Sequence, residues 1–156
     1  PLAQFVEMVC QVALGAALSY AAAMVPRSLR RWFIIHCVVD LLVALPLLLA
    51  PRALLGWLSW QAIDPMAARI VAAALFGIGL ESYWGRNGSV ETFRGMLRLK
   101  VIWSGTSLLG ALWSQAEGGP PAAWAVVVTF GVFHVIWLRY WLQLRRGSSA
   151  TTAAGF

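Results

Sequence analysis

Charged residues are scarce in this chain: only 12% of its 156 residues are Asp, Glu, Lys or Arg, whereas 60% are hydrophobic. Soluble domains typically contain about 25% charged and about 45–50% apolar residues, so the composition departs from theirs in the direction of membrane proteins. The mean hydropathy of +0.74 points the same way. The length is that of a single domain.

Cysteine is also scarce. Only Cys10 and Cys37 occur, and both fall inside apolar runs. Two such cysteines provide neither a disulfide framework nor a zinc motif, and we expect both thiols to be buried and inert. A glycine-rich phosphate loop, a nucleophile elbow and an HExxH zinc motif are missing from the sequence as well. These absences remove several of the usual signatures of soluble enzymes.

Acidic residues are outnumbered by basic ones, six to twelve, which gives a formal net charge of +6. The basic residues stand at the edges of apolar runs, and this placement indicates contacts with lipid head groups and a role in membrane topology. We therefore expect membrane lipids and other transmembrane helices, in a homo- or hetero-oligomer, as partners, and no nucleic acid.

Five apolar segments predict an all-α, polytopic transmembrane helical bundle. They cover residues 2–25, 32–49, 66–84, 92–113 and 122–142. Only helices and closed barrels satisfy their backbone hydrogen bonds in hydrocarbon, and these segments lack the alternation of strands. The first segment is only moderately hydrophobic, so the alternative is four spans with an N-terminal interfacial helix. Residues 1–146 form the predicted domain, and residues 147–156 a polar, disordered cytoplasmic tail.

Several local signals predict where these segments begin and end. Asp64 followed by Pro65 predicts a helix start, with Asp64 as the N-cap. Pro46 is expected to kink or loosen the second segment because it removes a backbone donor. Residues 85–88 read GRNG, which is typical of a turn. Residues 53–63 form a short amphipathic stretch whose tryptophans suit the membrane interface.

The distribution of basic residues predicts the orientation. With five spans and the N-terminus outside, only Arg52 and Arg69 fall on the outer side. The ten that fall on the cytoplasmic side, as the positive-inside rule requires, are Arg27, Arg30, Arg31, Arg86, Arg94, Arg98, Lys100, Arg139, Arg145 and Arg146. The C-terminus is then cytoplasmic, in a bacterial-type inner membrane, and Lys100 is expected to extend to the head groups.

The second segment carries two ionisable residues, His36 and Asp40, inside its apolar run. Ionisable residues are costly within a membrane and mark functional sites. These two are four residues apart and therefore share one helix face. Glu81, Ser104 and His134 fall at comparable depths in three other segments, given the rise of about 1.5 Å per residue. We expect the five side chains to form a polar pocket near the cytoplasmic surface.

Three kinds of chemistry fit such a pocket. In the first, it binds a quinone-like amphiphile: His36 is the hydrogen-bond partner, Asp40 orients it, and Glu81 and His134 relay protons to the cytoplasm. In the second, His36 and His134 ligate a metal, a haem or a chlorin. In the third, the polar groups are structural hydrogen bonds between helices. The aromatic residues that either wall the head group or form a belt at the lipid interface are Trp32, Phe33, Trp103, Phe130, Phe133 and Trp137.

Residues 32 to 145 resemble the broad DoxX-like group of small four-helix membrane proteins. The resemblance is carried by LLLAPRALLGWL at Leu47–Leu58 and by DPMAARIVAAALFGIGLES at Asp64–Ser82, followed by a basic turn and two further spans. Named members of that group are linked to quinone-coupled sulfur oxidation, so the resemblance implies a quinone-type ligand. It maps no catalytic residue onto this chain.

The loops between the segments are too short to hold a soluble catalytic domain. We therefore expect a non-catalytic accessory or ligand-binding subunit of a redox membrane assembly, either respiratory or photosynthetic. The alternative is a component of a quinone-coupled membrane oxidoreductase, in which His36 and Asp40 serve as hydrogen-bond and proton-relay groups.

Overall fold

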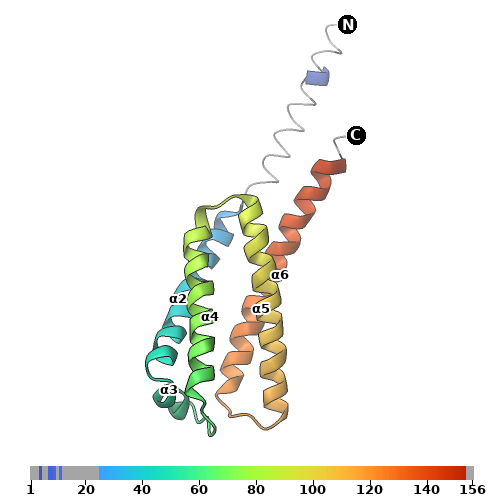
Figure 1. Ribbon diagram of the computed structural model, residues 1–156. Coiled ribbons are helices and arrows are strands. Elements are labelled where there is room, and N and C mark those ends of the chain that lie inside the picture. Colours follow the sequence, from blue (N-terminus) through green and yellow to red (C-terminus); the bar gives the residue numbers. More distant parts are fainter. Residues whose placement is uncertain (1–3, 5–6, 10, 12–24, 154–156) are drawn as a thin grey trace.

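The computed structural model in Figure 1 describes Gln4, residues 7–9, Gln11 and residues 25–153, with side chains as far as Arg146. This part of the chain is all-α and contains no strand. Its main elements are α2 (Arg27–Leu49), α3 (Pro51–Trp57), α4 (Pro65–Trp84), the 3₁₀ turn η1 (Gly85–Asn87), α5 (Val90–Ala116) and α6 (Ala123–Ala153). The predicted first segment, residues 2–25, lies largely outside the described residues.

The four long helices form two antiparallel pairs (Figure 1). α2 packs along α4 and α5 packs along α6, while the short α3 contacts α2 and α4 at one end. Toward the other end, the two pairs share a core of large buried side chains that includes Phe33, Phe93 and Trp137. The Phe33 ring centroid lies 4.8 Å from that of Phe93 and 5.5 Å from that of Trp137. A smaller core around Leu47 and Ala72 lies beside α3.

The predicted start of the third segment is confirmed. The Asp64 carboxylate accepts hydrogen bonds from the backbone N–H groups of Met66 (2.8 Å) and Ala67 (3.3 Å), and Pro65 occupies the first turn of α4. An N-cap of this kind accepts hydrogen bonds from the N–H groups of the first helical turn, which have no carbonyl partner within the helix.

Replacing this cap is expected to weaken the first helical pair. We predict that Asp64→Ala lowers the free energy of unfolding by about 1 kcal/mol, whereas Asp64→Asn, which keeps a side-chain acceptor, loses much less. The measurement is unfolding of the full chain in detergent micelles, followed by far-ultraviolet circular dichroism. Equal losses in the two variants would contradict the capping role.

The helix boundaries at α2, α3 and α6 differ most from the predicted ones. α2 begins at Arg27, earlier than predicted, because a helix continues through the basic residues that flank an apolar run. α6 continues to Ala153, where a disordered tail is predicted, and no proline occurs after position 142 to stop it. The amphipathic stretch predicted at residues 53–63 is the shorter α3, which starts at Pro51 because proline suits the first turn of a helix.

The outward surfaces of the long helices are apolar. Leu42 on α2, Ile70 on α4, Leu109 on α5 and Val135 on α6 are each 60% or more exposed. α5 is less hydrophobic than its neighbours, because charged residues fill its first half and several hydroxyl side chains follow. The described stretches long and apolar enough to cross a membrane are Arg27–Leu49, Pro65–Asn87 and Ala123–Arg146.

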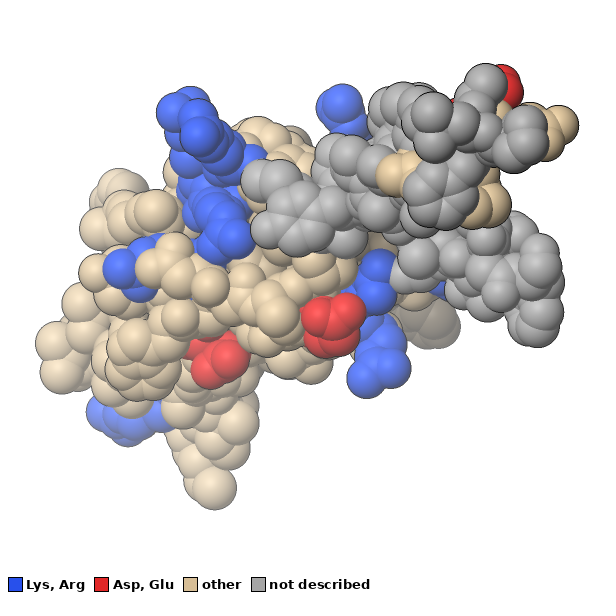
Figure 2. All heavy atoms as spheres, turned by 90° about the horizontal axis from the view of Figure 1, so that it is seen from above, with Lys and Arg blue, Asp and Glu red and all other residues tan. Residues whose placement is uncertain are grey.

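One end of the bundle is rich in arginine. The start of α2, the end of α4 and the start of α5 meet there, beside the C-terminal half of α6 (Figure 1), and arginine side chains lie around this end in Figure 2. The Arg30 guanidinium donates to the carbonyl of Arg86 (2.5 Å), and that of Arg94 donates to the carbonyl of Leu144 (3.1 Å). The residues that define this arginine-rich end are Arg27, Arg30, Arg31, Arg86, Arg94, Arg98, Arg139, Arg145 and Arg146.

Candidate functional site

A pocket of about 360 Å³ lies between the two helical pairs. Along α2 its lining runs from His36, which is nearest the arginine-rich end, to Leu47 beside α3. The part near α3 is apolar, with Leu54, Leu55 and Trp60, whereas the opposite part contains most of the polar groups. The polar groups at that end are His36, Asp40, Lys100, Ser104 and the indole of Trp137, and Thr129 of α6 also lines the pocket. We refer to this space as the inter-pair pocket.

We call Lys100, His36 and Asp40 the polar cluster of this pocket, and Lys100 is at its centre. Its side chain extends from α5 into the bundle and is only 3% exposed. The ammonium nitrogen lies 3.2 Å from Nδ1 of His36 on α2 and donates to the hydroxyl of Ser82 on α4 at 2.7 Å. A lysine of the second helical pair is thus held by two side chains of the first. Burial of a cation is costly unless an anion accompanies it.

Asp40 supplies that anion. Its Oδ2 lies 2.8 Å from the same His36 nitrogen, one helical turn along α2. Lys100 and Asp40 therefore contact one ring nitrogen from the two sides of the polar cluster. That nitrogen either carries a proton and donates it, or accepts one, but it does not do both at once. The protonation states of the three groups are therefore linked.

Aromatic rings enclose this cluster. The Lys100 ammonium lies 5.1 Å from the ring centroid of Phe33 and 5.1 Å from that of Trp137, within the range of cation–π attraction. The imidazole of His36 packs edge-on against the rings of Phe133 (4.8 Å) and Trp137 (5.1 Å). The rings keep water away from the charges and fix the orientation of the imidazole.

Two buried polar atoms of the pocket wall form no well-directed hydrogen bond with any residue that the structure describes. They are Nε1 of Trp137 and Oδ2 of Asp40. The Trp137 side chain is completely buried, so bulk water does not reach its N–H group. Buried polar groups are nearly always hydrogen-bonded, and an exception calls for a functional explanation. Both atoms belong to residues that line the inter-pair pocket.

Close helix packing fixes the position of Asp40. A β-carbon added at Gly79 of α4 would lie 2.9 Å from the β-carbon of Asp40 and 3.3 Å from its Oδ2. In the second helical pair, a β-carbon at Gly105 would lie 3.0 Å from Cε1 of His134. Small residues at such positions allow two helices to approach closely.

The structure brings together three of the predicted site residues, His36, Asp40 and Ser104, at the wall of the inter-pair pocket. The Ser104 hydroxyl donates to the backbone carbonyl of Lys100 (2.6 Å) and lies 3.0 Å from Nδ1 of His134. The predicted aromatic residues that line the pocket are Trp103, Phe130, Phe133 and Trp137.

Four of the predicted site residues lie outside the pocket lining. Glu81 is exposed, because Ser82 occupies the inward position at this level of α4. His134 is half-buried and contacts Ser104 rather than the pocket. Trp32 and Phe33 pack in the aromatic core that joins the two helical pairs. The lining therefore differs from the predicted one at these four positions.

Lys100 is the residue that the sequence interpretation placed wrongly. It is expected to extend to the head groups, yet it is buried. Because α5 starts at Val90, Lys100 lies about 15 Å from the helix start, too deep for its side chain to turn toward the surface. A signal for burial was present: Phe93, Leu97, Lys100 and Ser104 recur at helical spacing and share one face.

Potential metal ligands are dispersed. The described residues contain no group of three or more His, Cys, Asp and Glu side chains that could hold a metal ion. Of the histidines predicted as minor candidates for metal or tetrapyrrole ligation, His36 contacts Asp40 and Lys100, and His134 contacts Ser104. Cys37 is a buried free thiol.

Comparison of the chain with protein-family models, with curated proteins and with solved structures gave no match. The resemblance to the DoxX-like group over residues 32–145 stays a prediction from the sequence.

Proposed function

We propose that the protein is an integral membrane protein that holds an amphiphilic ligand in the inter-pair pocket. The membrane placement is supported by an inverted distribution of polarity, in which Leu42 and Ile70 are exposed while Lys100 and Ser104 are buried. Large exposed apolar surfaces are rare on soluble monomers. Membrane bundles, in contrast, turn their ionisable groups inward and their apolar side chains toward lipid.

In this proposal, α5 crosses the membrane together with α2, α4 and α6. Its polar side chains Lys100 and Ser104 are buried in the bundle, whereas Ile102 and Leu109 are exposed. It also packs along α6, so the two helices cover the same depth. The arginine-rich end lies on the cytoplasmic side under the positive-inside rule. The predicted span at residues 2–25 would be the fifth.

The polar cluster fits a neutral head group that accepts hydrogen bonds. Lys100 and Trp137 both provide N–H donors at the pocket wall. Asp40 balances the charge of Lys100, so an anionic head group would leave the buried site with excess negative charge. A carbonyl oxygen meets both conditions, and the apolar wall near α3 suits an alkyl or isoprenoid tail. The observation that carries the proposal is the unpartnered Trp137 N–H beside the buried Lys100.

The ligand we propose is a quinone-like amphiphile, and the role is that of a ligand-binding accessory subunit in a redox membrane assembly. Such molecules combine ring carbonyls with an apolar tail, and the DoxX-like resemblance implies the same class. A second role, as a component of a quinone-coupled oxidoreductase, is favoured by one contact pattern. Because Lys100 and Asp40 contact the same nitrogen of His36, the cluster can deliver a proton to a carbonyl oxygen while a partner oxidoreductase subunit supplies the electrons that reduce the ring.

Binding of a short-chain quinone to the full chain in detergent, measured by calorimetric titration, tests this proposal. Trp137→Phe keeps an aromatic ring but removes the N–H donor, and we expect it to weaken binding about tenfold, the effect of losing one buried hydrogen bond. Trp113→Phe is the matched control, because Trp113 is 71% exposed on α5. The control should bind the quinone like the unaltered chain.

An organic extract and an optical spectrum of the purified protein provide independent readouts. Quinone that co-purifies with the unaltered chain and is depleted from Trp137→Phe supports the proposal. Equal affinity in the two tryptophan variants would show that the indole does not contact the head group. A chain that neither binds nor co-purifies with quinone, or a Soret or chlorin band that is lost in His134→Ala, would replace the proposal with a different ligand class.

A further inference from the structure

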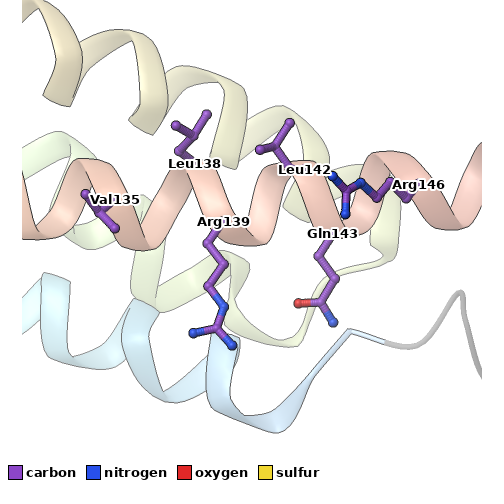
Figure 3. A pocket seen from close by; sticks show the side chains of 6 residues that line it. All are labelled: Val135, Leu138, Arg139, Leu142, Gln143 and Arg146. Carbon is purple, nitrogen blue, oxygen red and sulfur yellow. The ribbon is translucent and has the colours of Figure 1, made fainter.

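A second concavity, of about 590 Å³, lies on the outer face of α6 (Figure 3). It belongs to the arginine-rich end and shares no lining residue with the inter-pair pocket. The side chains that line this α6 groove are Val135, Leu138, Arg139, Leu142, Gln143 and Arg146.

The α6 groove has an apolar side and a polar side: Leu138 and Leu142 leave the helix on one side, and Arg139 and Gln143 leave it on the other (Figure 3). Val135 begins it on the side of the bundle centre, and Arg146 ends it on the C-terminal side. Over these residues the helix rises about 16 Å, which is roughly the thickness of the hydrocarbon in one leaflet. Arg139 and Gln143 leave α6 on the same side, which places two polar side chains next to each other (Figure 3).

Arg139 and Arg146 differ from Arg30, Arg94 and Arg145 at this end, whose guanidinium groups have partners within the chain. Arg30 and Arg94 donate to backbone carbonyls, and the Arg145 guanidinium lies 4.7 Å from an indole ring centroid. Within the described part of the chain, no hydrogen bond, ion pair or ring contact occupies the guanidinium group of Arg139 or Arg146. Both side chains are exposed, so an anion from outside can reach them.

We propose that the α6 groove binds an acidic phospholipid of the leaflet at the arginine-rich end. The planar guanidinium groups of Arg139 and Arg146 hold the phosphate oxygens with paired N–H donors, and the Gln143 amide adds another. An acyl chain lies along Val135 and Leu142. The inference rests on the membrane placement of the proposed function, but it does not depend on any ligand in the inter-pair pocket.

Native mass spectrometry of the full chain in detergent, with phosphatidylglycerol and phosphatidylcholine of identical acyl chains, tests the inference. We expect a clear preference for phosphatidylglycerol, which falls about fivefold for each arginine replaced in Arg139→Gln/Arg146→Gln. The matched control is Arg27→Gln/Arg31→Gln, which removes the same charge from exposed positions at the same end. It should keep the preference of the unaltered chain. Arg139→Lys/Arg146→Lys keeps the charge without the paired donors and should fall between the two.

The remaining outcomes overturn the inference. Equal losses in the two glutamine double variants would indicate general attraction to a charged surface, and equal binding of both lipids would remove charge recognition. Release of the lipid by inorganic phosphate at millimolar concentration would identify a phosphate site that does not use the acyl chain. Recovery of the chain in the soluble fraction without detergent would refute the membrane placement itself, so the two failures are distinguishable.

Discussion

Replacing Gly79 by alanine is expected to push α2 away from α4 and to lower the free energy of unfolding by about 1–3 kcal/mol. The added carbon would stand 2.9 Å from the β-carbon of Asp40 and 3.5 Å from the carbonyl oxygen of Cys37. Neither atom is the end of a flexible side chain, so the helices themselves have to move. The shift also displaces Asp40 from His36, and the affinity for a short-chain quinone should fall with the stability.

Gly77→Ala is the matched control on the same helix. A β-carbon at position 77 meets no atom within 4 Å. Alanine is preferred to glycine in a helix by up to about 1 kcal/mol, so this variant should be as stable as the unaltered chain or more stable. Thermal unfolding of both variants in the same detergent, followed by circular dichroism, makes the comparison. If the two alanines had the same effect, the close contact between Gly79 and Asp40 would not exist in solution.

Removal of one charge from the polar cluster is expected to have the largest effect on stability. Asp40→Asn leaves the buried ammonium of Lys100 without an anion, and Lys100→Met leaves the carboxylate without a cation. Breaking a buried charge pair in this way costs about 3–5 kcal/mol. Each single variant should therefore unfold far more easily than the unaltered chain, as measured by chemical denaturation in micelles.

The double variant Asp40→Asn/Lys100→Met separates charge compensation from packing. With both charges removed, we expect most of the lost stability to return, because neutral replacement of a buried pair is often tolerated. The coupling energy is obtained from the four-member cycle of unfolding free energies. Losses that simply add would show that Asp40 is not the counter-ion of Lys100.

The features of this fold that follow from local sequence were predictable. Asp64 and Pro65 specify the start of α4 through a cap and a fixed backbone angle, which depend on neighbouring residues alone. His36, Asp40 and Ser104 interrupt apolar runs, and polar groups in such runs turn toward one another because lipid offers them no partner. The helical architecture and three of the polar pocket residues could be predicted on this basis.

The misplaced residues depend on how each helix is rotated about its axis, which hydropathy does not determine. Neighbouring helical residues differ by about 100° in direction, so a small rotation decides whether Glu81 or Ser82 faces inward. Lys100 was expected at the surface because the direction in which it leaves α5 was not known. That the indole N–H of Trp137 has no hydrogen-bond partner among the described residues can be seen only from the positions of all its neighbours. The ligand class and the number of spans stay predictions.

Lys100 belongs to the second pair of helices, whereas both side chains that hold its ammonium, His36 and Ser82, belong to the first. A nascent second hairpin that entered the bilayer alone would carry a bare ammonium into hydrocarbon, which is strongly disfavoured. The first hairpin is synthesised earlier and already presents the receiving groups. Biosynthetic order and the energetics of docking therefore agree. The second pair of helices is unfavourable in hydrocarbon until it packs against the first.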